Sequence, residues 1–137
     1  GVTMGLGTDG AASNDNLDLF EEIKLACLLQ KHETGDPTML PAAEAWTMAT
    51  QGGADALGLP TGRLEEGKRA DLILVDLKRA QLVPPHDLTS LLAYAANGSV
   101  VDTTICDGRV LMREGHVEGE EAILAEAGAR AAALRER

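Results

Sequence analysis

The first nine residues of the chain constrain its fold more than any other segment. Bulky apolar residues alternate with small ones over residues 2–9, which is typical of a strand because successive side chains point to opposite faces. The bulky set is Val2, Met4 and Leu6, and the small set is Thr3, Gly5 and Gly7. Because glycine weakens a strand interior, two glycines on one face indicate that another group approaches that face closely. The sequence therefore predicts a strand whose small-residue face ends in the carboxylate of Asp9.

Turn residues then lead into the first of several predicted helices. Three polar residues can cap a helix over residues 15–33, namely Ser13, Asn14 and Asp15. The apolar residues of this helix form a wide face, so we expect it to be heavily buried. Shorter helices are predicted over residues 41–50 and 54–57, with an interruption at Gly52-Gly53 and an end at Gly58.

The residues after about position 60 combine short strands with two more helices. A short buried strand is predicted over residues 72–75 and a helix over residues 87–96. Asp107-Gly108 lies between two apolar runs and predicts a hairpin, because a type I′ turn needs positive φ at both central residues. A last helix is predicted over residues 119–136. Its apolar stripe consists of Ile123, Leu124, Ala127, Ala131 and Leu134.

Composition and charge exclude several classes of function. The formal net charge of −10 and the 2% of aromatic residues argue against a phosphate-binding face or a base-stacking platform, so we expect no nucleic-acid partner. The longest apolar runs are far shorter than the ~20 residues of a membrane span, and no signal peptide opens the chain. The two cysteines, Cys27 and Cys106, suit a reducing compartment as packed thiols. We therefore expect a cytoplasmic protein without membrane contact.

Asp9 is the strongest candidate for chemistry. A carboxylate at the C-terminal end of a strand with a small-residue face occupies the position at which barrel enzymes place catalytic groups. The alternative is that Asp9 caps the following turn through backbone N–H groups, and the pattern favours neither. A dinucleotide-binding pattern, Gly5-x-Gly7-x-x-Gly10, is opposed by the carboxylate inside the turn. The scattered histidines, His32, His86 and His116, are expected to be solvated or locally hydrogen-bonded.

Three motifs resemble the metal-dependent amidohydrolase superfamily, and they follow that family's order over essentially the whole chain. The first is the run from Gly7 to Glu22, GTDGAASNDNLDLFEE, which is similar to the last barrel strand and the helix after it. The second runs from Ala54 to Asp76, and the third is the hairpin from Val101 to Gly115. Within the superfamily the motifs resemble the chlorohydrolase and cytosine-deaminase-like branch, and most closely the 5-methylthioadenosine/S-adenosylhomocysteine deaminases.

The resemblance implies a fold and a division of the chain. The implied class is α/β: the last strand–helix unit of a TIM-type (β/α)8 barrel, the C-terminal part of a small β-sandwich, and a C-terminal helix. Residues 1–58 would supply the end of the barrel, residues 59–115 the part of the sandwich, and residues 116–137 a helix that packs on the barrel. Since a complete barrel needs about 250 residues, the chain resembles the C-terminal portion of such an enzyme.

The resemblance also implies a chemistry. Members of the family hold a divalent metal, usually zinc or iron, with histidines from earlier strands and one aspartate from the last strand, which matches Asp9. That aspartate would accept the proton of a metal-activated water, which attacks the amino-bearing carbon of an adenosine-type purine. Ser13 and Asn14 are candidates for the rim of the substrate site. Because zinc takes four ligands, we expect the chain alone to bind no metal and to be inactive.

Two other hypotheses remain open at this stage. A related hydrolase could act on another ring, such as guanine, a pterin-like ring or a chloro-triazine, or the chain could be a structural or interaction module without catalysis. For the enzyme we expect a homo-oligomer. For the separate chain, strand 2–9 would lack neighbouring strands, so we expect it to dimerise, rearrange or leave residues 1–14 poorly ordered.

Overall fold

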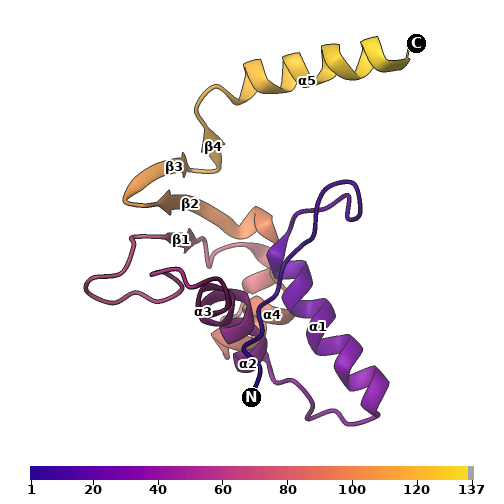
Figure 1. The fold of residues 1–137 in the computed structure, drawn as a ribbon, viewed down its shortest axis with the longest axis vertical. Coiled ribbons are helices and arrows are strands. Elements are labelled where there is room, and N and C mark those ends of the chain that lie inside the picture. The colour runs from indigo at the N-terminus through magenta and orange to yellow at the C-terminus, as the bar shows by residue number, and fades with distance from the viewer. Residues whose placement is uncertain (136–137) are drawn as a thin grey trace.

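Apart from the last one, the helices gather into one block, and the strands form a single sheet beside it (Figure 1). This arrangement is that of a computed structural model, which describes residues 1–135. The last residue of the helix predicted over 119–136, and the end of the expected segment 116–137, lie outside the described residues. The described part of the chain is a mixed α/β structure with one four-stranded antiparallel sheet.

Helix α1, Leu19–Thr34, begins later than the sequence pattern predicts. Its N-cap is Asp18, whose side chain accepts a hydrogen bond from the Phe20 N–H at 3.0 Å. A cap of this kind satisfies one of the N–H groups that the first helical turn leaves free. The predicted start at residue 15 is therefore wrong, as are its three predicted caps, Ser13, Asn14 and Asp15.

The buried face of α1 is narrower than predicted. Phe20, Ile23 and Cys27 follow a helical spacing and are buried, so they form one stripe against the rest of the block. Leu17, just before the helix, and Leu29, near its end, are each 60% exposed. The prediction of a heavily buried helix holds for this one stripe only.

A second helical stretch runs from Ala42 to Leu57 without a break. It consists of α2, Ala42–Thr47, a π-helical turn, Met48–Gly52, and α3, Gly53–Leu57. The predicted interruption at Gly52-Gly53 is wrong, because these glycines keep helical φ angles of −62° and −61°. The predicted end at Gly58 is confirmed by its left-handed φ of 66°.

The glycines of this stretch let the N-terminal segment run close to the helix. A Cβ built on Gly5 would lie 2.7 Å from the Gly53 Cα, which is closer than real side chains come. Next to this contact, the Leu6 N–H donates to the Met48 carbonyl at 3.1 Å. The close approach predicted for the glycine face is therefore confirmed at Gly5, whereas a Cβ on Gly7 would meet open space.

The strand predicted over residues 2–9 is wrong. Residues 1–10 have no regular secondary structure, and Val2 and Met4 are 87% and 59% exposed. A strand needs a neighbouring strand for its ladder hydrogen bonds, and the sheet of the described residues contains no strand beside this segment. The segment instead runs past α3 and α1 without a ladder (Figure 1).

The sheet contains its strands in chain order. They are β1, Leu72–Val75; β2, Val101–Cys106; β3, Arg109–Arg113; and β4, His116–Val117. The β2–β3 hairpin turns at Asp107 and Gly108, whose φ angles of 50° and 75° confirm the predicted hairpin. Strand β1 lies at an edge, and Ile73 and Leu74 are 41% and 51% exposed. The prediction of a buried strand is wrong here, because the described residues cover neither face of β1 completely.

The chain between β1 and β2 returns to the helical block. A short 3-10 turn, Ala80–Leu82, precedes α4, Leu88–Tyr94, and a second one, Gly98–Val100, leads into β2. Helix α4 lies within the predicted range 87–96, and Asp87 is its N-cap.

Two apolar clusters hold the helical block together. In the first, Ile23 and Cys27 of α1 meet Ala45 of α2 and Ala93 of α4. In the second, Phe20 of α1 meets the buried residues of the connections before and after α4, which are Leu82, Ala96 and Val100. The rings of Phe20 and Trp46 also contact edge to face, with their centroids 5.7 Å apart. Residues from both halves of the chain therefore meet in each of the two clusters.

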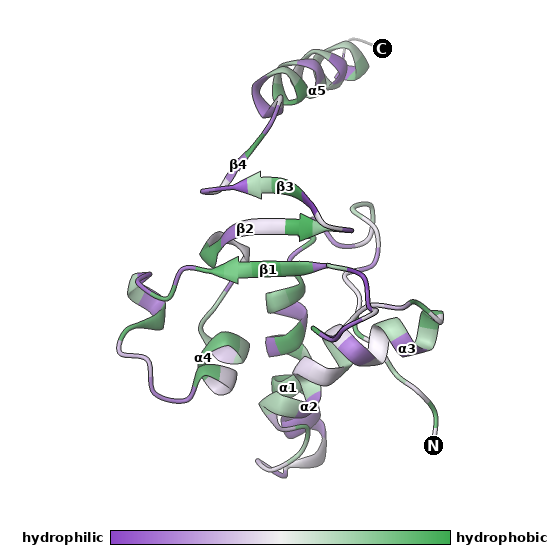
Figure 2. Ribbon diagram, turned by 90° about the vertical axis from the view of Figure 1, so that its left-hand side faces the viewer, coloured by the Kyte–Doolittle hydropathy of each residue, from purple (hydrophilic) through white to green (hydrophobic). Residues whose placement is uncertain are grey.

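Helix α5, Glu120–Arg135, projects away from the block and the sheet (Figures 1 and 2). Its predicted apolar stripe forms but stays open, since Ile123, Leu124 and Leu134 are 61%, 64% and 68% exposed. The packing of this helix on a barrel is therefore not observed in the described residues. None of the helices within residues 1–135 is long and apolar enough to cross a membrane.

Candidate functional site

Asp9 lies in an exposed turn between the N-terminal segment and α1. Its backbone has a left-handed φ of 59°, and its Oδ1 accepts a hydrogen bond from the Gly10 N–H at 2.7 Å. Most L-residues pay roughly 1–2 kcal/mol for this conformation, and Asp adopts it more readily because its side chain can bond locally. Asp9 thus makes a local capping contact, while its Oδ2 makes no hydrogen bond within the described residues.

Asn14 ties this turn to α1. Its Nδ2 donates to the Thr8 carbonyl at 3.1 Å and to Glu22 Oε1 at 2.8 Å, and its Oδ1 accepts from the Asn16 N–H at 3.3 Å. The hydroxyl of Ser13 is exposed and makes no hydrogen bond in the described part of the chain. Of the two residues predicted for the substrate rim, Ser13 therefore presents a free polar group, whereas the amide of Asn14 is engaged inside the chain.

The described residues do not form a metal site by themselves. No group of three or more His, Cys, Asp or Glu side chains in residues 1–135 is placed to hold an ion. Asp9 alone does not satisfy zinc, which takes four ligands. The described residues therefore do not fit a complete divalent-metal site by themselves.

The histidines take no part in such a cluster. All three side chains are exposed, and the Nδ1 of His86 lies 3.0 Å from the Pro84 carbonyl. The prediction of solvated or locally hydrogen-bonded histidines is confirmed.

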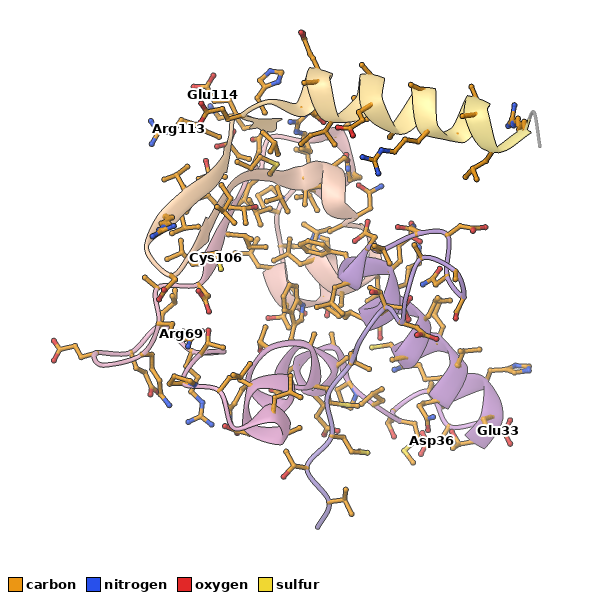
Figure 3. The ribbon with its side chains drawn as sticks, turned by 45° about the horizontal axis from the view of Figure 1, so that its top comes forward. Glu33, Asp36, Arg69, Cys106, Arg113 and Glu114 are labelled. Atoms are coloured by element: carbon orange, nitrogen blue, oxygen red, sulfur yellow. The ribbon has the colours of Figure 1, made fainter. Side chains whose placement is uncertain are left out.

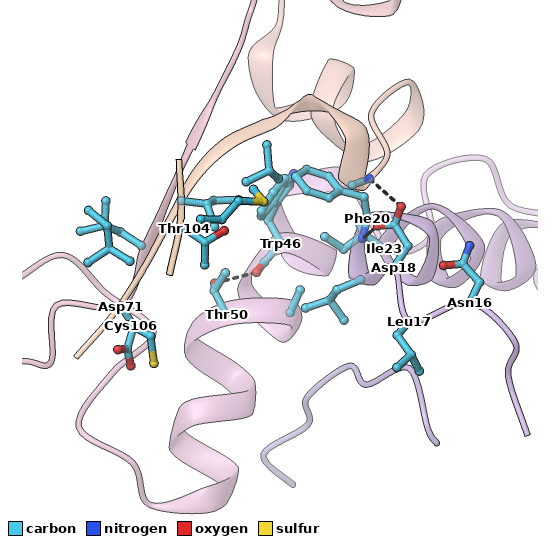
Figure 4. Close-up of a pocket in the computed structure, with 18 residues that line it drawn as sticks. Asn16, Leu17, Asp18, Phe20, Ile23, Trp46, Thr50, Asp71, Thr104 and Cys106 are labelled. Atoms are coloured by element: carbon cyan, nitrogen blue, oxygen red, sulfur yellow. Dashed lines mark hydrogen bonds between the residues drawn. The ribbon is translucent and has the colours of Figure 1, made fainter. Parts of the chain in front are cut away.

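A cavity of about 900 Å³ lies between the helical block and the sheet (Figure 4). Phe20 and Trp46 line it beside Asp18, and Asp71 and Cys106 line it on the side of the sheet. The residues predicted for the site are not part of this lining; they are Asp9, Ser13 and Asn14. The cavity and the Asp9 turn are therefore separate features of the described structure.

Asp71 joins the hairpin to the loop before β1. Its Oδ1 accepts from the Asp107 N–H at 2.6 Å, and its Oδ2 accepts from the Thr61 hydroxyl at 2.7 Å. The hydrogen bond from the Asp107 N–H, followed by the one from Thr61, holds the pKa of Asp71 below its ordinary value. This carboxylate thus fixes the turn of the sheet, which gives it a structural role.

The two cysteines have different environments. Cys27 is fully buried in α1, whereas Cys106 is exposed at the end of β2. Figure 3 shows Cys106 at one end of the sheet and Arg113 and Glu114 at the other. The prediction of two packed thiols is therefore wrong for Cys106, because the tight turn places this last residue of β2 at the rim of the sheet.

Comparison with known proteins identifies the family. The sequence pattern described as the amidohydrolase family matches residues 1–111. The chain therefore belongs to the amidohydrolase family, as its three motifs indicated. The matched range contains the Asp9 turn, the helical block and the hairpin as far as the first residues of β3.

Two curated relatives match nearly the whole chain. The chain is 55% identical over 134 residues to the 5'-deoxyadenosine deaminase of Methanoregula boonei, and this match covers 98% of this chain and 30% of the relative. It is 55% identical over 137 residues to the 5-methylthioadenosine/S-adenosylhomocysteine deaminase of Pelotomaculum thermopropionicum, and this match covers 98% of this chain and 32% of that protein. The chain thus spans less than a third of the length of these relatives.

Solved structures show the same fold. An adenosine deaminase from Xanthomonas campestris with bound zinc is 36% identical, with a TM-score of 0.93 over 99% of this chain and 32% of that one. The atrazine chlorohydrolase from Arthrobacter aurescens complexed with zinc is 32% identical, with a TM-score of 0.77 over 93% of this chain and 29% of that one. The described fold therefore matches a part of zinc-containing enzymes of this family.

Two residues of the Asp9 region were not predicted from the sequence. Asp18 caps α1, and Glu22 receives the amide of Asn14. The cap had a local signal, because an Asp followed three residues later by Glu21 matches a capping box. The contact between Glu22 and Asn14 has no such local sequence signal, since it depends on how the turn folds back on the helix.

Proposed function

We propose that the chain is part of a metal-dependent hydrolase that deaminates an adenosine-type purine. The observation that carries this proposal is the 55% identity, over 98% of the chain, to relatives named as 5'-deoxyadenosine and 5-methylthioadenosine/S-adenosylhomocysteine deaminases. Such an enzyme replaces the amino group on a purine carbon by oxygen from water and releases ammonia. The chain then supplies one portion of the active site, as a C-terminal portion would, and is expected to be inactive alone.

In this proposal Asp9 is a metal ligand and the acceptor of a proton from water. Its Oδ1 is held by the Gly10 N–H, and its Oδ2 is open to solvent and free within the described residues. A carboxylate with one oxygen fixed and the other free is oriented for a contact outside the chain, as ligands held by neighbouring groups usually are. When bound, zinc or iron would supply an acidified water, and its other ligands would come from outside residues 1–135.

Ser13 is the better of the two candidates for contact with the purine. Its hydroxyl is exposed in the same turn as Asp9, so it has both a donor and an acceptor to offer a substrate. Asn14 would first have to give up hydrogen bonds within the chain.

The test uses a chimaera, in which this chain replaces the matching segment of the Methanoregula boonei deaminase. The chimaera should release ammonia from 5'-deoxyadenosine. Asp9→Asn should lower kcat by about 10²–10⁴-fold, the usual contribution of a positioned proton acceptor, and should lower the bound metal measured by elemental analysis. The matched control is Asp15→Asn, which changes an exposed carboxylate later in the same region and should leave both values unchanged.

Near-normal turnover and metal content in the Asp9→Asn chimaera would overturn the role of Asp9. A chimaera that folds but deaminates no purine would overturn the proposed activity. The 137-residue chain alone should release no ammonia from the same substrate. Light scattering of the active chimaera tests the predicted homo-oligomer, and the cytoplasmic location stays a prediction.

A second candidate is hydrolysis of a chloro-triazine or another ring. The fold match to the atrazine chlorohydrolase, with a TM-score of 0.77, favours it over unrelated activities. The lower identity, 32% against 55%, makes it the weaker candidate. The two candidates are distinguished by measuring kcat/KM of the chimaera for adenosine-type purines, guanine, a pterin and atrazine. The substrate with the highest kcat/KM identifies the activity.

A further inference from the structure

We propose that Asn14 and Glu22 are positioning residues, which brace the Asp9 turn against α1 and so fix the direction of the Asp9 carboxylate. This inference rests on the proposed function of Asp9. It gives Asn14 a task different from the substrate contact that the sequence suggested. It also gives a role to Glu22, which ends the first family motif but had no role assigned to it from the sequence.

The orientation of the Asn14 amide is set by its neighbours. The two acceptors around it, the Thr8 carbonyl and Glu22 Oε1, both face Nδ2, and the one donor, the Asn16 N–H, faces Oδ1. The reverse orientation would place an oxygen against two acceptors and an NH₂ group against a donor. The amide therefore has one favourable orientation, and both of its N–H groups serve the brace.

The hydrogen bond from Asn14 to the Thr8 carbonyl directly restricts the backbone of Asp9. The Thr8 carbonyl belongs to the peptide plane that contains the Asp9 nitrogen, so fixing this carbonyl restricts the φ angle of Asp9. That angle is 59°, in the left-handed region, and such conformations persist where the surrounding structure determines them. The Gly10 N–H then holds the carboxylate from the other side of the residue. Backbone and side chain of Asp9 are thus fixed by separate contacts.

Glu22 provides a firm anchor for this brace. It lies in the first turn of α1 and is half-buried, and the next residue, Ile23, is 2% exposed in the core. Movement of this part of α1 would disturb the packed cluster, so the helix transmits the rigidity of the core to the turn. Glu21 differs, because its Oε2 accepts from the Asn16 side chain and does not reach the 8–14 turn directly.

The pair of neighbouring acids gives a matched set of variants. Glu22→Ala removes the acceptor of the brace, and Glu22→Gln keeps an acceptor oxygen while removing the charge. Glu21→Ala removes an equal charge from the same helical turn, so any effect on the helix dipole is shared. The two alanine variants differ in the contact that each removes: Glu22→Ala loses the hydrogen bond from Asn14, and Glu21→Ala loses the one from the Asn16 side chain.

The first measurement uses the 137-residue chain itself. Hydrogen exchange of the Asn14 side-chain amide, followed by NMR, should be slowed in the natural sequence and in Glu22→Gln. It should become about tenfold faster in Glu22→Ala, since one hydrogen bond is worth roughly this factor, and stay slow in Glu21→Ala. Equal exchange rates in all four proteins would overturn the brace.

The second measurement uses the deaminase chimaera. Glu22→Ala and Asn14→Ala should each lower kcat by about 10–100-fold, the usual cost of removing a group that orients a ligand, while KM for 5'-deoxyadenosine changes less than about threefold. Glu22→Gln should recover most of the lost kcat, and Glu21→Ala should lose little. A rise in KM at constant kcat would indicate that Asn14 binds substrate, and would overturn its positioning role.

The failure of this inference differs from the failure of the proposed function. If Asp9→Asn abolishes turnover and Glu22→Ala does not reduce it, Asp9 keeps its role and the brace is overturned. If Asp9→Asn leaves turnover intact, the proposed role of Asp9 fails and the inference fails with it. Equal losses in Glu22→Ala and Glu21→Ala would also overturn the inference, because the effect would then belong to the helix.

Discussion

The helical block and the sheet with α5 use their apolar residues differently. Within residues 1–135, every buried hydrophobic side chain belongs to the stretch from Phe20 to Val100, in α1–α4 or in their connections. The strands contribute one buried residue, Thr103, and α5 contributes none. Figure 2 shows apolar segments in β1, β2 and α5 as well, so the difference does not come from hydrophobicity.

An apolar face of this chain is buried only where the chain supplies a second face to cover it. The block has four helices that cover one another, whereas the sheet and α5 lack such a cover in the described residues. The exposed surface of the described structure is 9824 Å². A compact monomer of the same mass would expose roughly 6,800 Å². The surplus agrees with a segment that spans less than a third of its relatives.

The largest difference in stability is expected when an isoleucine is truncated in each of the two regions. Ile23 of the block is 2% exposed and Ile123 of α5 is 61% exposed. Ile23→Ala should lower the free energy of unfolding by about 2–5 kcal/mol, because it removes buried carbons and leaves a cavity. Ile123→Ala should change it by less than about 0.5 kcal/mol. Urea unfolding followed by circular dichroism measures both.

Ile23→Val keeps this comparison informative if the alanine variant does not fold. It removes one methylene and should lower the free energy of unfolding by about 0.5–1.5 kcal/mol. Similar losses for Ile23→Ala and Ile123→Ala would contradict the comparison, because α5 would then have a packed face in solution.

A smaller loss of stability is expected when the aspartate that links α1 to the segment before β2 is replaced. Asp18 caps α1 and also accepts from the Gly98 N–H, which precedes β2, whereas Asp87 caps α4 within its own segment. Asp18→Ala should lower the free energy of unfolding by about 2 kcal/mol and Asp87→Ala by about 1 kcal/mol. The reverse order of the two losses in urea unfolding would show that the long-range contact contributes nothing.

A weaker, pH-dependent effect is expected in the sheet. The Asp107 N–H and the Thr61 hydroxyl lower the pKa of Asp71, so its charged form is favoured in the folded state. Such a group stabilises the fold fully above the unfolded Asp pKa of about 3.9, and this contribution is lost as the pH falls through the lowered folded value. The protection of the Asp107 amide against hydrogen exchange, taken relative to an unfolded peptide at the same pH, should therefore fall below about pH 4.

Asp71→Asn is the control for this pH effect. It keeps an acceptor oxygen but removes the titrating charge, so the loss of protection at the Asp107 amide on acidification should be smaller than in the natural sequence. Identical pH profiles in the two proteins would assign the acid sensitivity to other carboxylates. Asp36 and Asp87 also have lowered pKa values, and both lie far from this turn along the chain.

The elements that could be predicted from the sequence are those decided by a few neighbouring residues. Asp107-Gly108 needs positive φ angles that its own residue types favour, and Gly58 ends a helix for the same reason. The strand over 2–9 depends on partners elsewhere, and the path through Gly52-Gly53 depends on a segment that packs against it. Local pattern carries no information on either, so both predictions were wrong.

The candidate site shows the same division. Asp9 could be singled out because a carboxylate ends an alternating segment and matches a family motif. Its left-handed φ and the brace from Asn14 could not be predicted, because the direction of the amide depends on an acceptor eight residues away on α1. The sequence thus indicated the reactive group and missed the contacts that orient it.

The smallest effect is expected from the largest change, the removal of α5. Ending the chain after Gly119 deletes a 16-residue helix whose side chains are all exposed, and whose ion pair between Arg130 and Glu126 lies within the helix. The free energy of unfolding of the block should change by less than about 0.5 kcal/mol, because none of the described side chains from Glu120 to Arg135 is buried. The signal of helix in circular dichroism should fall while the urea midpoint stays constant. A loss above about 1 kcal/mol would mean that the exposed apolar stripe of α5 packs on the block in solution. The sheet alone would then remain as the region whose apolar residues lack a cover.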